Sequence, residues 1–316
     1  MLQFNLLINA IVAGVLLGGF YAAVSIGVTI SFGMLDIANI SQPAFILLGS
    51  YAAYIVGSID LSVHAPHLVE AVNGIPLLRY LISNGHIDPI LTGIAMLPVF
   101  FLIGMAVYRL YYFAFERRGE QAIQGLAFFF GLLFVGEVTL VLVFGVDYRF
   151  VDAAYIGPSV HLGILELPLR MLVPCVFSLI MVGLVQLYLS RSFIGRAILA
   201  VSQDRVALQL MAASPIKIKQ IAFGISIATC SLAGSFLIII QQVEPSIGRD
   251  YIGRIFAICV LGGMTSMPGM LVAAMLLGVV ENITSTFYGP SWSPAVAFGL
   301  LLVTLAVRPS GLLGRQ

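Results

Sequence analysis

The chain has 316 residues, of which 60% are hydrophobic and only 9% are charged. A soluble globular domain carries about 25% charged and about 45–50% apolar residues, so this chain has too few charges to coat a surface that faces water. The composition excludes a soluble enzyme, a disordered chain and a nucleic-acid binder that relies on basic patches. It leaves an integral membrane protein with many spans.

The charged residues are gathered in short clusters, separated by long charge-free stretches such as 1–35 and 282–307. A helix needs about 20 apolar residues to cross the hydrocarbon core, whereas a β-barrel would show alternating polarity. Because a spanning backbone must satisfy its own hydrogen bonds, the stretches predict helices. The predicted fold class is an all-α, polytopic membrane protein with about seven to nine transmembrane helices. Residues 1–316 form a single transmembrane domain, with room for broken or re-entrant segments.

The first span is expected at about 5–31. No Lys or Arg precedes it and it is too long for a signal-peptide core, so we interpret it as a retained span. Its Gly14-x-x-x-Gly18 spacing either permits close approach of another helix or reflects ordinary glycine enrichment in membrane helices. Further spans are expected at about 37–58, 89–111, 122–146, 171–190 and 220–241, with polar loops at 59–88 and 147–170 and a loop at 242–254.

The tail contains three apolar runs, near 255–267, 269–288 and 292–307. The first is short and closes with Gly262, Gly263 and Pro268, so it predicts either a full span or a half-helix that turns back. Nine crossings result if all three runs cross the membrane, and seven result if two of them form a re-entrant pair.

Basic residues orient this map, because cytoplasmic loops carry an excess of Lys and Arg. The opposite set of loops has five basic residues. The set assigned to the cytoplasm has ten, which are Arg109, Arg117, Arg118, Arg191, Arg196, Arg205, Lys217, Lys219, Arg308 and Arg315. This places the N-terminus outside and the C-terminus in the cytoplasm.

Two interrupted segments echo each other along the chain. Phe32-Gly33-Met34 precedes Pro43, and Gly262-Gly263-Met264 precedes Pro268, in each case followed by an apolar run. Interruptions at matching places in two halves indicate an inverted repeat with a transport site near the membrane midplane. The alternative is coincidence, since Gly and Pro are common in such helices.

The segment 191–219 is the longest and most basic of the expected cytoplasmic loops. Ser202 is a candidate N-cap and Asp204 would lie in the first turn of a short amphipathic helix at 203–213. Val206, Leu210 and Ala213 recur at helical spacing. This helix either lies on the inner leaflet, attracted to anionic lipid, or docks a cytoplasmic partner.

Four stretches of the sequence carry a resemblance. Gly195-Arg196-Ala197 through Gln203-Asp204-Arg205-Val206-Ala207 resembles the coupling segment of ATP-binding-cassette (ABC) importer permeases of the branched-chain amino-acid family. Ile30 to Tyr51 looks like that family's first conserved block, and Leu261 to Gly278 looks like its late block. Arg308 to Arg315 is similar to its C-terminal signature. The short N-terminus is similar to that of the smaller of the two permease types in the family.

The resemblance implies a permease subunit in a bacterial cytoplasmic (inner) membrane, which moves branched-chain or related amino acids by alternating access. It implies a second permease chain, two cytoplasmic ATPase subunits and an extracytoplasmic solute-binding protein. It also implies that Gly195, Arg196, Ser202, Asp204, Arg205, Ala207 and Leu210 couple the chain to the ATPase. No Gly-rich nucleotide loop followed by Lys-Ser or Lys-Thr occurs, so ATP and Mg²⁺ are expected on the partner ATPase and no enzymatic activity or cofactor is expected here.

One departure from the family concerns the substrate. The family often has Ala-His-Gly where this chain has Ser41-Gln42-Pro43. Gln42 retains hydrogen bonding but cannot titrate, and Pro43 stiffens the backbone. Relatives that handle urea and other small polar solutes therefore provide an alternative substrate class.

Ionisable and polar residues inside spans are functional candidates, because burial of a charge in lipid is costly. Glu137 and Glu281 are the clearest candidates for the translocation pathway, and Asn39, Ser41 and Gln42 are candidates for a polar lining. Each has a structural alternative, as a hydrogen bond inside the bundle or a cap on a broken helix. A stand-alone secondary transporter that uses Glu137 or Glu281 for coupling is the rival class.

Metal binding is not expected. The three cysteines lie in apolar stretches without CxxC spacing, which is typical of packing residues. The His64-x-x-His67 pair contains Pro66, which disfavours a helix, and the sequence places no acidic partner beside it.

Overall fold

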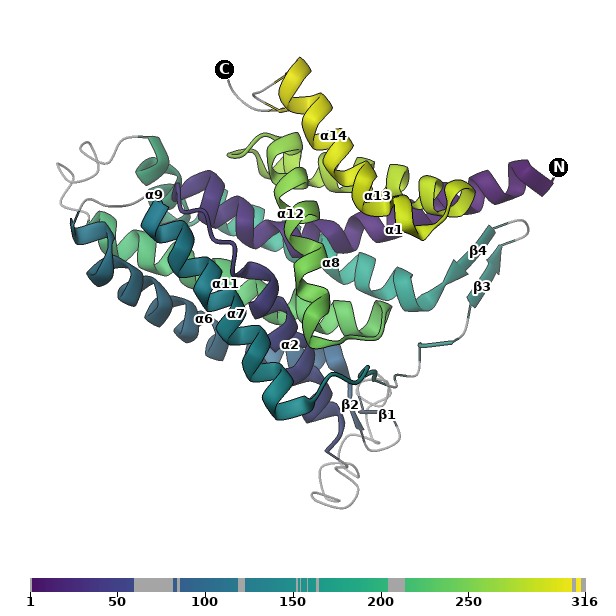
Figure 1. The fold of residues 1–316 in the computed structure, drawn as a ribbon, viewed down its shortest axis with the longest axis horizontal. Coiled ribbons are helices and arrows are strands. Elements are labelled where there is room, and N and C mark those ends of the chain that lie inside the picture. The colour runs from purple at the N-terminus through teal and green to yellow at the C-terminus, as the bar shows by residue number, and fades with distance from the viewer. Residues whose placement is uncertain are drawn as a thin grey trace.

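The computed structural model describes residues 2–59, 82–83, 86–118, 123–151, 153, 155–157, 159–162, 165–203, 214–308 and 311–313. Figure 1 shows a helical molecule in which two short antiparallel hairpins lie in the loops. The helices are α1 (Leu2–Val28), α2 (Gln42–Gly57), α6 (Pro89–Ala114), α7 (Ile123–Phe144), α8 (Leu169–Arg191), α9 (Phe193–Gln203), α11 (Pro215–Ile240), α12 (Gly248–Gly262), α13 (Met267–Tyr288) and α14 (Ser293–Val307). One hairpin pairs β1 (Ile82–Ser83) with β2 (His86–Ile87), and the other pairs β3 (Ser159–Leu162) with β4 (Leu165–Pro168). Short helical turns lie at Thr29–Met34 (η1, a π-helix), Glu116–Arg118 (η2), Pro245–Ile247 (η3) and Pro290–Trp292 (η4).

Within the described residues, seven helices are long and apolar enough to cross a membrane. They comprise α1 with its π-helical end, α6, α7, α8, α11, α13 and α14 with η4. The prediction of a polytopic, all-α membrane protein with seven to nine spans is therefore confirmed. Among the described residues, α2 is a shorter apolar helix of 16 residues, and α12 has 15 residues with charges in its first two turns.

Helix α12 begins earlier in the chain than the sequence predicts. The loop expected at 242–254 is in part helical, because α12 begins at Gly248 and includes Arg249, Asp250 and Arg254. These charges made the segment resemble a loop. They are accommodated in a helix because both arginines pair with glutamates on other helices.

The core of the bundle is built around α11, which is the most deeply buried of the seven long helices and packs on α6 and α2. The most extensive contact of α1 is with α13, although the two helices lie near opposite ends of the sequence. In Figure 1, α12 runs through the middle of the molecule, with α13 and α14 on one side of it.

Glycines allow α1 and α13 to touch backbone to backbone. A Cβ atom built on Gly14 would lie 2.6 Å from the Cα of Val279, and one built on Gly18 would lie 2.6 Å from the Cα of Met275. Gly278 of α13 faces both glycines, so its own Cβ would lie 2.5 Å from the carbonyl oxygen of Gly14. The interpretation of Gly14-x-x-x-Gly18 as a close-approach motif is confirmed.

The two interrupted segments meet in the structure. Gly33 lies in the π-helical turn that ends the first helix, and Met264 follows the glycine pair that ends α12. A Cβ on Gly33 would lie only 1.7 Å from the carbonyl oxygen of Met264, so nothing larger than glycine fits there. The two breaks are therefore in direct contact, and we call the contact between Gly33 and Met264 the joint. The inverted repeat itself stays a prediction.

The C-terminal signature is attached to the same joint. The backbone N–H of Leu312 donates to the carbonyl oxygen of Leu261 at 2.8 Å, and that of Leu313 donates to the carbonyl oxygen of Gly262 at 3.4 Å. These carbonyls lie in the last turn of α12, where a helix has no partners of its own. The segment after α14 thus supplies hydrogen-bond donors to the free carbonyl groups at the end of α12.

Candidate functional site

Glu137 lies on α7, and its carboxylate is held by Arg249 from the start of α12. The Nε atom of Arg249 donates to Oε2 at 2.9 Å, and its Nη2 atom pairs with Oε1. The glutamate side chain is 9% exposed, whereas the arginine side chain is 56% exposed. The pair is therefore closed on the glutamate side and open on the arginine side.

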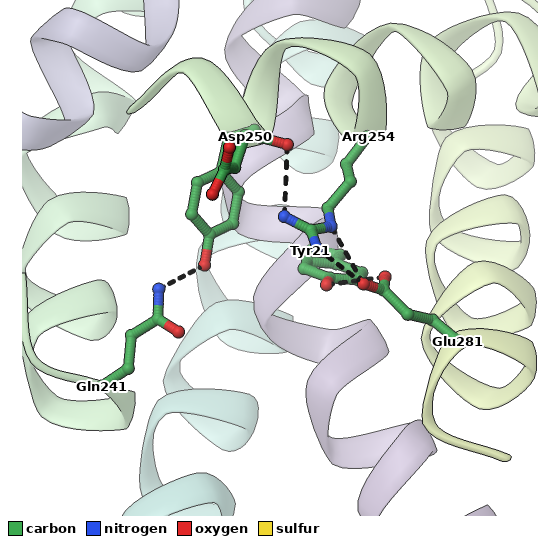
Figure 2. A network of polar contacts seen from close by, with 6 residues as sticks. Tyr21, Gln241, Asp250, Arg254 and Glu281 are labelled. Carbon is green, nitrogen blue, oxygen red and sulfur yellow. Dashed lines mark hydrogen bonds and ion pairs between the residues drawn. The ribbon is translucent and has the colours of Figure 1, made fainter. Parts of the chain in front are cut away.

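Glu281 lies on α13 inside a closed network with α1 and α12 (Figure 2). The hydroxyl of Tyr21 donates to Oε2 at 2.8 Å, and the guanidinium of Arg254 donates to Oε1 at 3.0 Å from Nε and lies 2.9 Å away at Nη2. Arg254 also donates from Nη1 to the backbone carbonyl of Asp250 and stacks over the ring of Tyr251. The side chains of Arg254 and Glu281 are only 16% and 5% exposed, and together with Tyr21 this pair links α1, α12 and α13.

Asn39, Ser41 and Gln42 form a buried cluster where the chain enters α2. The Oδ1 atom of Asn39 accepts from the backbone N–H and the hydroxyl of Ser41, at 3.1 and 2.6 Å. The amide nitrogen of Asn39 donates to Oε1 of Gln42 at 3.2 Å. Gln42 in turn donates from Nε2 to the carbonyl oxygen of Ser226 at 3.2 Å and to the sulfur of Cys230 on α11. All three candidates are at most 1% exposed. Their polar groups link the break to α11, and their pathway role stays a prediction.

The coupling segment begins with a sharp corner between α8 and α9. The hydroxyl of Ser192 accepts from the backbone N–H of Gly195 at 2.9 Å, which is the geometry of an N-cap for α9. A Cβ on Gly195 would lie 2.4 Å from the carbonyl oxygen of Tyr188, so glycine permits the corner. The side chain of Arg196 is exposed on this helix.

The predicted N-cap at Ser202 is wrong, because Ser202 lies inside α9, which continues to Gln203. This helix was not predicted, because the Gly195-Arg196 pair resembles a loop. Four further candidates for ATPase coupling lie outside the described residues. They are Asp204, Arg205, Ala207 and Leu210.

A cavity of about 460 Å³ with a mixed polar and apolar lining lies beside α9, between the end of α8 and the turn that joins α12 to α13. Its lining includes Gln186, Ser190, Thr265 and Ser266. A neighbouring cavity of about 270 Å³ adjoins the joint between the two breaks and includes Gly33 and Val201. Leu199 and Val201 of α9 therefore line two small cavities of mixed polarity beside the breaks.

The partners of the buried charges are not apparent from the sequence. Arg249 and Arg254 were assigned to a loop, and Lys219 was counted only as a basic residue of the cytoplasmic set. Lys219 is 2% exposed and pairs with Glu116, whose other oxygen accepts from the hydroxyl of Tyr108 at 2.8 Å. A glutamate in an apolar span requires a cation, and that requirement was the available signal.

Among the described residues, no group of three or more His, Cys, Asp and Glu side chains gathers to hold a metal ion. His64 and His67 lie outside the described residues. The three cysteines are buried and free of disulfides.

The site thus combines a bundle of membrane-spanning helices, two broken segments joined at one place, and charged pairs inside the spans. The sequence model of the family described as "Branched-chain amino acid transport system / permease component" matches residues 10–305. The chain belongs to this family. It is a multi-pass membrane protein of the permease type.

Relatives of the smaller permease type match over nearly their whole length. The permease is 27% identical to the high-affinity branched-chain amino acid transport system permease protein BraD of Pseudomonas aeruginosa, over 98% of this chain and 96% of that protein. It is 24% identical to the corresponding LivH of Escherichia coli K12, over 99% of this chain and 97% of that protein. The LivM permease of the same organism is 35% identical over 127 residues, which cover 40% of this chain and 29% of that protein. No solved structure matches the chain.

Proposed function

We propose that this permease is a membrane-spanning subunit of an ABC importer for branched-chain or related amino acids. The observation that carries the proposal is the match to BraD and LivH over almost the entire length of each chain. Similarity that includes every span supports a shared mode of transport rather than a shared fold alone.

The proposed complex contains a second permease chain, two cytoplasmic ATPases that bind ATP and Mg²⁺, and an extracytoplasmic solute-binding protein. The local match to LivM indicates that this chain and the larger permease type are related. This relationship supports a pair that consists of one permease of each type. The proposed setting is the bacterial cytoplasmic membrane, with the N-terminus outside and the C-terminus in the cytoplasm.

The corner between α8 and α9 is placed to transmit motion from the coupling segment to the membrane helices. α9 contacts α8, α11 and the π-helical turn that ends α1, so it joins the 204–213 segment to the first break. We infer that closure of the ATPases moves 204–213 and α9 together. The joint between Gly33 and Met264 then passes this motion to α12, which switches the pathway between outward-open and inward-open states.

Uptake of labelled solutes in a deletion strain tests the proposal. Cells that carry the complete transporter should accumulate L-leucine, and removal of the ATPase genes should abolish accumulation. Uptake that persists without the ATPase would refute ATP coupling and favour a secondary transporter. Urea, offered in parallel, tests the alternative substrate class that Ser41-Gln42-Pro43 raises.

Two substitutions test the coupling segment. Asp204→Lys and Ala207→Glu should abolish uptake while leaving the permease in the membrane, because they alter the docking surface and no transmembrane helix. Normal uptake by both variants would refute the docking role of this segment.

A further inference from the structure

The two arginines of α12 make ion pairs of different character. Arg254 is enclosed by Tyr21, Tyr251 and Glu281, and its side chain is 16% exposed. Arg249 binds Glu137 by two nitrogens, yet 56% of its side chain is exposed. In the described part of the chain, no residue accepts a hydrogen bond from the third nitrogen of Arg249, Nη1. The first pair is complete, whereas the second has capacity for another anion.

The open pair lies at membrane depth. Glu137 is the fifteenth of 22 residues in α7, so it lies about 10 Å from the C-terminal end of that helix. Around it, α7 presents the exposed apolar side chains of Phe134, Val135 and Val138. A half-exposed arginine side chain in such surroundings would be costly against lipid tails. Its exposed side is therefore expected to face water or a polar ligand.

The chemistry of the pair matches an amino acid. A guanidinium binds a carboxylate through two parallel hydrogen bonds, and a buried carboxylate binds an ammonium group. A zwitterion offers one of each. If Arg249 turns its donors from Glu137 to the carboxylate of the solute, Glu137 becomes free to bind the ammonium. Two ion pairs replace one, and the site stays neutral throughout.

We propose that Arg249 and Glu137 form a binding site for the α-carboxylate and the α-ammonium of a zwitterionic amino acid during translocation. This inference rests on the proposed function and deepens it, because it names the two charges that the permease recognises. It also gives α12 a role, since the helix that carries Arg249 ends at the joint with the first break.

The neutral double variant E137Q/R249Q separates recognition from structure. It removes both charges but leaves two amides that are able to hydrogen-bond across the same gap. We expect initial L-leucine uptake to fall about ten-fold or more, as for the loss of a charge-assisted hydrogen bond to the solute. Membrane content and assembly with the other subunits should be unchanged. R249Q alone should show the same loss.

Arg109→Gln is the matched control. Arg109 is also exposed and also stacks over a phenylalanine ring at 5.8 Å, as Arg249 does, but no described carboxylate pairs with it. Its substitution removes one positive charge and should leave uptake unchanged. A loss in R109Q equal to that in R249Q would show a general effect of charge and would overturn the proposal.

Four outcomes of this experiment can be distinguished. Wild-type uptake by E137Q/R249Q would overturn the proposal, since the pair would then only join α7 to α12. Failure of the double variant to accumulate in the membrane would also overturn it, because the charges would be required for assembly. Absence of L-leucine uptake in the wild type would instead refute the proposed function. A ten-fold loss in the variant beside an active wild type supports the site.

Discussion

Gly278→Ala is the sharpest perturbation of the contact between α1 and α13. The added methyl group would lie 2.5 Å from the carbonyl oxygen of Gly14 and from the nitrogen of Gly18. Ordinary van der Waals contact begins at 3.4 Å, so α13 must move away from α1 by roughly 0.9 Å. Both obstacles are backbone atoms, which have no rotamer by which to avoid the clash.

The displacement reaches the polar contacts one turn further along α13. Asn282 donates to the carbonyl oxygen of Ala10 at 2.8 Å, and Glu281 accepts from Tyr21 at 2.8 Å. A shift of about 0.9 Å would stretch both bonds beyond useful range. Overpacking costs about 1–3 kcal/mol, the lost bond of Asn282 about 0.5–1.5 kcal/mol and the lost bond to the carboxylate of Glu281 about 1.5–3 kcal/mol, while alanine gains about 1 kcal/mol of helix propensity. We expect a net loss of about 2–6 kcal/mol.

Thermal denaturation in detergent, followed by size-exclusion of a fluorescent fusion, measures the effect. Gly131→Ala on α7 and Gly183→Ala on α8 are matched controls, because no atom lies within 4 Å of a Cβ built at either position. Their midpoints should stay unchanged or rise, since alanine favours a helix. A midpoint for Gly278→Ala equal to that for Gly183→Ala would refute the close contact.

Three further substitutions test individual contacts. Lys219→Met should lower the free energy of unfolding by about 3–5 kcal/mol, because it leaves Glu116 without its cation. A second change in the same chain, Glu116→Gln, should restore part of the lost stability in the same thermal assay. Tyr21→Phe should cost about 1.5–3 kcal/mol through the lost hydrogen bond to an ionised carboxylate, and an unchanged midpoint would contradict the network of Figure 2. Gly195→Ala should abolish L-leucine uptake while the permease still reaches the membrane, because the added methyl group would clash with the backbone of α8 and displace α9. Wild-type uptake would argue against the proposed transmission of motion through α9.

Local pattern was sufficient to predict the long spans. The expected span at 89–111 corresponds to α6 at Pro89–Ala114, and the span at 171–190 corresponds to α8 at Leu169–Arg191. Uninterrupted apolar runs of this length have few alternatives in a membrane. The close approach of α1 to a partner was also visible in Gly14-x-x-x-Gly18, although the partner was not.

Features that depend on distant partners could not be predicted. The start of α12 was placed too late because Arg249 and Arg254 look soluble until their glutamates are known. The cap that Ser192 provides for α9 was not predicted, and the helix expected at 203–213 lies outside the described residues beyond Gln203. Gln42 meets Ser226 across 184 residues, and periodicity carries no information about such a pair.

The network around Glu281 has a consequence for the order of assembly during synthesis. Tyr21 and Glu281 are separated by 260 positions, which a ribosome covers in roughly 13–50 s at about 5–20 residues per second. Arg254 precedes Glu281 by only 27 positions, or about 1–5 s. The arginine and the glutamate therefore emerge together, and α12 and α13 can enter the bilayer as a hairpin whose buried charges already cancel. Until that hairpin is inserted, the Gly14 and Gly18 face of α1 has no α13 to pack against.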